Sequence, residues 1–341
     1  MIMSPTRPNQ ITIGCRGAGM TPHDCATAIS YAGGAPAGKH GRMRMRAFAW
    51  FLGLMVVALA AVALFAYPAW RLLHPHFDFP FHRIGERVGM LALLLGFLAL
   101  ARRLKLADRS SLGYGAPRRV FLREMIIALA LGVASMLGVV AIMAALGVLT
   151  WRSALPLPAA ALAKLLVTGA LSGFAVAFIE ETFLRGAMHT AIERESGTPA
   201  AVLLTALLYA ATHFFAKVHI DAAQVTPHSG LDLLAGTLQA FAHPATIADA
   251  FLALLAVGVA LGLVRAATGN IAACIGLHAG WVWVILVAHE LSRPRPGAPL
   301  GFLLSRFDGF VGWLVLAWTV LLAVPLWRFY AARAAPLNRA A

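Results

Sequence analysis

Five ionisable residues lie within or beside long apolar stretches of this 341-residue chain: Glu180, Glu181, Arg185, His213 and His278. The two glutamates directly follow fifteen uncharged residues, and each histidine stands in an otherwise apolar run. A charged side chain at membrane depth costs at least about 2.5–3.5 kcal/mol and usually serves a function. These five residues are therefore the candidates for chemistry.

The spacing of these residues indicates how they could divide the work. Glu181 and Arg185 are four residues apart, so they can pair on one face of a helix. Glu180 is rotated by about 100° around the same helix and stays free for another partner. Taken alone, the pattern also fits a frayed helix end with an interfacial ion pair. Two histidines in the company of a glutamate pair favour a functional site.

The heights of these residues along their helices can be compared from the sequence. Glu180 lies 16 residues before Ser196, in a segment typical of a turn, and His213 lies 17 residues after it. At 1.5 Å per residue, both stand about 24–26 Å from the turn on antiparallel neighbours. His278 lies nine residues beyond Gly269, about 14 Å along its own helix. These heights agree if the charged hairpin around Ser196 projects into the cytoplasm.

One carboxylate and two imidazoles in a pocket of low dielectric permit two chemistries. In the first, Glu180 deprotonates a water that attacks a peptide carbonyl, His213 helps to hold that water, and His278 hydrogen-bonds the developing oxyanion. In the second, Glu180, His213 and His278 are the three ligands of a catalytic zinc, with water in the fourth position. The cofactor is thus either none or one divalent metal such as zinc. We prefer the metal-free alternative slightly, and the residues leave both open.

The composition predicts the class of fold that positions these residues. Hydrophobic residues make up 60% of the chain and charged residues 12%, whereas soluble domains have roughly 45–50% and 25%. Several uncharged stretches approach the roughly 20 residues that cross a bilayer as a helix, and no period-2 pattern suggests a barrel. We therefore expect an all-α, polytopic transmembrane bundle of about eight helices. The expected spans are Ala47–Trp70, Val88–Ala101, Met125–Thr150, Leu165–Ile179, Thr198–Thr212, Ala250–Val264, Ile271–Ala288 and Gly309–Trp327.

The distribution of positive charge predicts how the chain sits in the membrane. The formal net charge is +14, but the basic residues gather at the ends of the spans and not on one soluble face, so nucleic acid is not an expected partner. Basic residues are dense before the first span and between 102 and 123, which places both segments in the cytoplasm. With eight spans, both termini and the short connection carrying Arg265 are then cytoplasmic. We expect a multi-pass protein of the inner or plasma membrane, if the source is bacterial.

The first 42 residues differ from the rest by composition. They are rich in Gly, Pro, Ala and Ser and lack hydrophobic periodicity, which predicts a disordered leader. If translation starts at Met43 or Met45, this leader is not made. Residues 43–341 are expected to form a single transmembrane domain.

Three motifs in the central part of the chain resemble those of a known family. They are Glu180-Glu181-x-x-x-Arg185-Gly186, an aromatic-x-x-x-His from Tyr209 to His213, and His278 within Ile-Gly-Leu-His-Ala-Gly-Trp. Their order and spacing over roughly residues 165–288 look like those of the CPBP family. This family comprises CAAX prenyl endopeptidases and bacteriocin-processing or Abi proteins, and it is related to the type II CAAX protease.

The resemblance implies an intramembrane endopeptidase of eight helices, either metalloprotease-like or of a glutamate type. It implies that Glu180 is the water-activating base alongside His213, that Glu181 and Arg185 orient the site, and that His278 serves the oxyanion. The expected partners are the lipid bilayer and a peptide or protein substrate at the membrane, with or without a lipid modification.

The chain departs from the family pattern at two positions. Tyr209 stands where the second motif usually has Phe, which adds a hydroxyl. Val282 stands four residues after His278, where the third motif often has Asn, and it cannot donate a side-chain hydrogen bond. Losing one oxyanion donor can cost roughly 10²–10³ in rate, unless the indole of Trp281 or Trp283 or a backbone N–H replaces it.

Two alternative functions follow from the same residues. The Val282 departure is the main support for a non-catalytic protein of the same fold, acting in bacteriocin immunity or as a scaffold. Buried glutamate and histidine also build transporters and proton relays. Against a transporter, the two halves of the chain lack a corresponding pair of broken spans.

Overall fold

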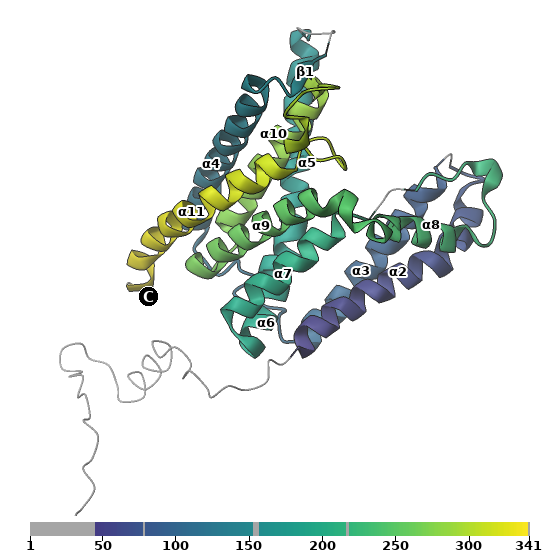
Figure 1. Ribbon diagram of the computed structural model, residues 1–341. Coiled ribbons are helices and arrows are strands. Elements are labelled where there is room, and N and C mark those ends of the chain that lie inside the picture. The colour runs from purple at the N-terminus through teal and green to yellow at the C-terminus, as the bar shows by residue number, and fades with distance from the viewer. Residues whose placement is uncertain (1–44, 78, 153–156, 216–217, 340–341) are drawn as a thin grey trace, which may run out of the picture. The chain divides into compact units, whose positions relative to one another are not determined.

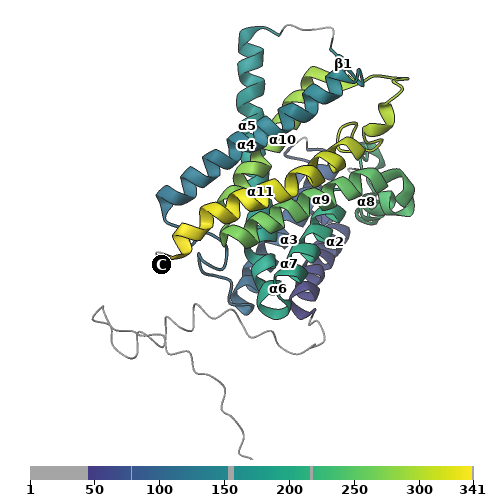
Figure 2. The same cartoon turned by 60° about the vertical axis from the view of Figure 1, so that its left-hand side comes forward.

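The computed structural model describes residues 45–77, 79–152, 157–215 and 218–339 of the chain, without the side chains of 335–339. The predicted disordered leader of residues 1–42 lies outside these ranges. The described part is almost wholly helical, as Figures 1 and 2 show. The expectation of an all-α bundle is confirmed.

The helices are named in chain order. They are α2 (Arg46–Leu73), α3 (Phe81–Arg103), α4 (Arg118–Ala145), α5 (Ala159–Glu181), the π-helical η1 (Thr182–Met188), α6 (His189–Ser196), α7 (Thr198–Thr212), α8 (Ser229–Leu238), α9 (Pro244–Thr268), α10 (Ala272–Leu291) and α11 (Trp313–Arg339). Three short 3₁₀ turns are η2 (Ala222–Gln224), η3 (Gln239–Ala242) and η4 (Gly301–Leu303), and two short strands, β1 (Leu149–Trp151) and β2 (Ser292–Pro294), pair antiparallel.

Proline and glycine mark where several of these helices begin and end. Pro80, Pro117 and Pro158 directly precede α3, α4 and α5, where the missing N–H costs no helical hydrogen bond. Gly197, with a φ of 83°, separates α6 from α7, and Gly269, with a φ of 67°, ends α9. Both glycines occupy the left-handed region that other residues rarely adopt, so the two sharp reversals predicted from the sequence are built there.

Seven helices in the described ranges are long and apolar enough to cross a membrane: α2, α3, α4, the continuous α5–η1–α6, α9, α10 and α11. Helix α7 has the predicted bounds, but its 15 residues span only about 22 Å, less than the roughly 30 Å of a hydrocarbon core. The chain is thus a multi-pass membrane protein, with seven candidate spans and the shorter apolar helix α7 in the part that the structure describes. The cytoplasmic placement of both termini stays a prediction.

The expected span Met125–Thr150 is wrong at both ends. Helix α4 begins at Arg118 and ends at Ala145, and Thr150 belongs to β1. Long arginine side chains at the start of a helix can reach the polar surface while their stems cover apolar groups. At the other end, Gly147 has a φ of 66°, which stops the helix before the apolar run ends.

Helix α10 lies at the centre of the bundle, packed against α4 and α5 (Figure 1). Glycines let the backbones of α4 and α10 touch. A Cβ on Gly280 would lie 2.8 Å from the Leu129 carbonyl oxygen, and one on Gly132 would lie 2.6 Å from that of Leu277. These contacts leave no room for a side chain, so they fix the height and rotation of α10 and of His278 on it.

The outer faces of the long helices are apolar. Large hydrophobic side chains on α2, α3, α5 and α11 are exposed, among them Leu64, Leu95, Leu171 and Leu321. A soluble protein rarely exposes so much contiguous apolar surface. These faces fit the lipid bilayer that the composition predicts as a partner.

Candidate active site

The two glutamates lie at the end of α5, directly before the π-helical turn η1. Such turns are rare and are frequently found at functional sites. The connection between α3 and α4 packs on this turn: the hydroxyls of Tyr114 and Thr182 are 2.5 Å apart, and burial raises the pKa of Tyr114. Gly186 permits this approach, because a Cβ there would lie 2.5 Å from the Leu112 carbonyl oxygen. A larger residue than glycine at position 186 of the first motif would therefore clash with the Leu112 backbone.

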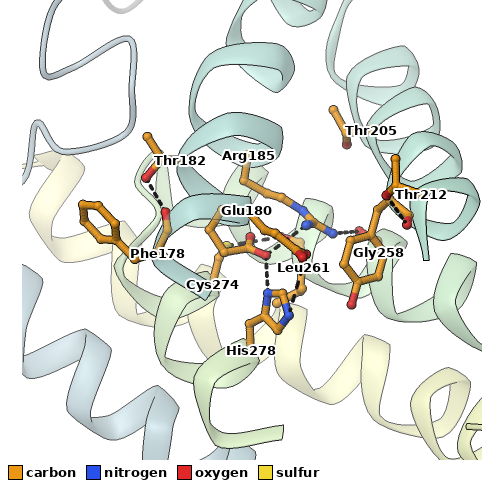
Figure 3. Close-up of polar contacts among 12 residues, drawn as sticks. Phe178, Glu180, Thr182, Arg185, Thr205, Thr212, Gly258, Leu261, Cys274 and His278 are labelled. Carbon is orange, nitrogen blue, oxygen red and sulfur yellow. Dashed lines mark hydrogen bonds and ion pairs between the residues drawn. The ribbon is translucent and has the colours of Figure 1, made fainter. Parts of the chain in front are cut away.

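Glu181 is the centre of a buried ion pair. Its side chain and that of Arg185 are fully buried, and Arg185 Nη1 donates to Glu181 Oε1 at 2.9 Å. The predicted pairing four residues apart is confirmed. Arg185 Nη2 also donates to the Gly258 carbonyl oxygen at 3.3 Å, which ties the pair to α9 (Figure 3).

Arg265 supports this cluster from the last turn of α9 and does not lie in the connection that follows this helix, where the sequence suggested it; the side of the membrane stays a prediction. Its side chain is buried, its Nε donates to the Arg185 carbonyl oxygen at 3.0 Å, and its Nη2 donates to Thr190 Oγ1 at 3.2 Å. The Arg185 carbonyl belongs to the π-helical turn. Arg265 therefore supplies a donor to the irregular backbone of η1, which explains a buried cation in an apolar helix.

His278 lies between the two neighbouring carboxylates. Its Nδ1 is 2.8 Å from Glu181 Oε1, and its Nε2 is 4.0 Å from Glu180 Oε2 (Figure 3). An ionised carboxylate only accepts hydrogen bonds, so Nδ1 carries the proton and donates. Glu180 Oε2 is buried and has no hydrogen-bond partner among the described residues. Glu181 Oε1 therefore accepts from both Arg185 and His278, whereas Glu181 Oε2, like Glu180 Oε2, is buried without a partner among the described residues, and no hydrogen bond to Glu180 is formed there.

His213 approaches the same place from the end of α7. Its Nδ1 is 2.8 Å from the Tyr209 carbonyl oxygen, so this nitrogen also carries a proton. The Tyr209 ring is 4.5 Å from the His213 ring and 5.9 Å from the His278 ring, centroid to centroid. His213 also interacts electrostatically with Glu180. The structure thus gathers all five predicted residues, with Tyr209 between the two imidazoles, while their roles stay predictions.

A cavity of about 380 Å³ adjoins His213 and His278, and residues of α4, α5, α7, α9, α10 and α11 line it, together with Phe307 and Asp308. Its walls are mostly apolar, with Tyr209, His213 and His278 among its polar groups. Val282 and Trp281 line it as well. A space of this size and character is typical of small-ligand and side-chain binding sites.

Val282 cannot donate the hydrogen bond to the oxyanion that Asn could donate at this position, and the sequence leaves open which group replaces it. The Trp283 indole N–H is buried without a hydrogen-bond partner, and its ring packs against Gly169 of α5. Trp283 is absent from the residues that line the cavity, whereas Trp281 is among them. Trp283 is therefore not a donor to this space.

The zinc alternative requires three ligand side chains close to one point. Among the residues that the structure describes, no three or more His, Cys, Asp or Glu side chains lie close enough to hold a metal ion. Donation of Nδ1 to an acceptor is a usual feature of metal-binding histidines, but it orients an imidazole for other roles equally well. The zinc site stays a prediction.

The fold and the site define a helical membrane protein with a buried Glu–Arg–His cluster beside an apolar cavity. Residues 161–284 match a family described as type II CAAX prenyl endopeptidase Rce1-like. This match contains all five predicted residues, and it supports a CPBP/CAAX protease family, as the motifs predict. It supports the general class of CAAX-protease-type intramembrane endopeptidase. Comparisons with curated proteins and with solved structures gave no match.

Proposed function

We propose that the protein hydrolyses a peptide bond at the membrane with a water activated by Glu180. The observation that carries this proposal is the free Glu180 Oε2, buried and 4.0 Å from the Nε2 of a fixed His278. That separation is too long for a direct hydrogen bond, but a water can bridge it with two bonds of about 2.8 Å. The site thus has a place for the attacking oxygen.

Two adjacent carboxylates take different roles because their surroundings differ. Glu181 accepts from Arg185 and His278, and it is used for orientation. Glu180 has no such partner and its side chain is 34% exposed, so it can reach a water and a substrate. Assignment of separate roles to neighbouring carboxylates by their environment is a known route to acid–base catalysis.

The proposed reaction proceeds in two proton transfers. Glu180 takes a proton from the water as its oxygen attacks the carbonyl carbon of the peptide bond, and the carbonyl oxygen becomes an oxyanion. The other hydrogen of the water points to the Nε2 acceptors of His278 and His213, which orient it. As the C–N bond breaks, Glu180 returns the proton to the leaving nitrogen. The products are a new carboxylic acid and a new amine, and the proton of the acid then passes to the amine or to solvent, which leaves a carboxylate.

A comparison of membrane peptides tests this function. Cells would express the wild type, Glu180→Gln, His213→Ala and the control Glu290→Gln. Glu290 is on the same helix as His278, its side chain is 61% exposed, and its ion pair with Arg152 at 3.6 Å is at the surface. We expect cleavage products with the wild type and the control and none with the two site variants. Identical peptide profiles in all four strains would sink the protease proposal.

Metal analysis of the purified protein addresses the cofactor separately. The metal-free mechanism predicts no bound divalent metal in the wild type and none in His278→Ala. One zinc per chain that disappears in His278→Ala would replace this mechanism with the zinc version.

A further inference from the structure

The three groups proposed to hold the attacking water, Glu180, His213 and His278, are acceptors, and of these His213 and His278 line the cavity while Glu180 does not. His213 and His278 each use their Nδ1 proton on a neighbouring oxygen, so in the neutral imidazole each Nε2 carries only a lone pair. Glu180 is a carboxylate and accepts as well. A water has two hydrogens, so it can donate to two of these acceptors at a time and be polarised by them. An oxyanion needs a donor, and a neutral His278 has none left.

The Tyr209 hydroxyl is placed to supply that donor. Tyr209 lines the cavity, and none of the hydrogen bonds within the described part of the chain involves its hydroxyl. Its ring contacts both imidazoles. We propose that Tyr209 donates a hydrogen bond to the carbonyl oxygen of the scissile bond and to the oxyanion formed from it, which makes it a catalytic residue. This inference rests on the proposed endopeptidase function.

The surroundings of Tyr209 hold its side chain in one orientation. The Arg185 guanidinium carbon lies 4.7 Å from the centre of the ring, and the side chain is only 3% exposed. A donor that is fixed before the reaction needs no reorganisation when charge develops, which is the source of oxyanion stabilisation. The proton stays on the Tyr209 oxygen throughout, so the proton balance of the proposed reaction is unchanged.

Other residues near the site supply this donor less well. Val282 lines the cavity but has no donor, and the Trp283 indole N–H points into the contact with α5. The Trp281 indole is a competing donor, since it lines the same cavity. The Tyr209 hydroxyl can therefore supply the hydrogen-bond donor that the apolar side chain of Val282 lacks.

The test uses Tyr209→Phe, which removes the hydroxyl and keeps the ring. The matched control is Tyr330→Phe, because the Tyr330 hydroxyl is also buried, has no partner in the described residues, and does not line the cavity. The probe is a fluorogenic peptide with the sequence of a site that is cleaved in cells expressing the wild type, chosen without reference to the Glu180→Gln strain. Each full-length variant is reconstituted in liposomes, and kcat, KM and the unfolding temperature are measured.

We expect Tyr209→Phe to lower kcat by roughly 10²–10³, the usual cost of one oxyanion donor, with KM and unfolding temperature unchanged. Tyr330→Phe should keep the wild-type kcat. Adding Val282→Asn to Tyr209→Phe should restore at least about tenfold of the lost kcat, because the amide returns a donor to the cavity; a packing role would not give this rescue.

Three results would overturn the inference. They are a wild-type kcat in Tyr209→Phe, a loss explained wholly by a lower unfolding temperature, and a kcat loss in Trp281→Phe but not in Tyr209→Phe. The Glu180→Gln variant distinguishes a failure of the proposed role of Tyr209 from a failure of the proposed endopeptidase function. If Glu180→Gln cleaves the probe like the wild type, the proposed function fails; if it is inactive while Tyr209→Phe is fully active, only the role of Tyr209 fails.

Discussion

Replacing Glu181 by Gln tests the buried ion pair most directly. The change keeps the shape of the side chain and removes its charge, which leaves the fully buried Arg185 with the Gly258 carbonyl and the Tyr209 ring as partners. Breaking one side of a buried pair costs about 3–5 kcal/mol, because the other charge stays uncompensated. Gln keeps one acceptor oxygen, so we expect a loss near the lower end, about 3 kcal/mol. His278 also loses its charged acceptor, and proteolysis should fall with it.

The assay is reversible unfolding in mixed detergent micelles, followed by tryptophan fluorescence, for Glu181→Gln, Arg185→Met and the double variant. If the pair is coupled as the contacts indicate, the double variant is less destabilised than the sum of the two single variants, by about 2 kcal/mol or more. Effects that add within about 0.5 kcal/mol would refute the reasoning, because independent sites behave in that way.

Two further predictions concern helix packing and a connection outside the membrane-spanning helices. Gly280→Ala should destabilise the protein and lower its activity, since a Cβ there would lie 2.8 Å from the α4 backbone, whereas Gly53→Ala, with open space around it, should do neither; equal unfolding temperatures for the two variants would contradict this. Hydrogen bonds from Ser110 and Ser111 hold the pKa of Asp108 well below its usual range, so its stabilising contribution is present above an unfolded pKa of about 3.9 and is lost as the pH falls below it. The difference in unfolding temperature between the wild type and Asp108→Asn should therefore shrink from about pH 5 to pH 3, and a difference that is constant over this range would exclude the effect.

The long helices could be predicted from the sequence because a segment in lipid must satisfy its own backbone hydrogen bonds. Helix α7 has the bounds that the apolar run Thr198–Thr212 predicts, since a glycine turn precedes it. The end of α4 could not be predicted in this way. Its apolar run continues through Gly147 into β1, and hydropathy does not distinguish helix from strand in a short apolar segment.

The candidate site was predictable in part for similar reasons. The pairing of Glu181 with Arg185 depends only on helical spacing, so the sequence is enough. The position of His278 between two carboxylates depends on the rotation of α10, which is set by contacts between distant segments. The role of Arg265 depends on the π-helical turn, and no side-chain pattern on α9 indicates that a carbonyl on another helix needs a donor.

The glycine contacts between α4 and α10 have a consequence for how this protein can change over evolution. Where backbones touch, as at Gly132 and Gly280, the position of His278 does not depend on the identity of the lipid-facing side chains. The apolar shell can therefore diverge to suit bilayers of different thickness or composition while the imidazole stays in place. Homologues should then vary freely on their outer faces and keep small residues where α4 and α10 touch.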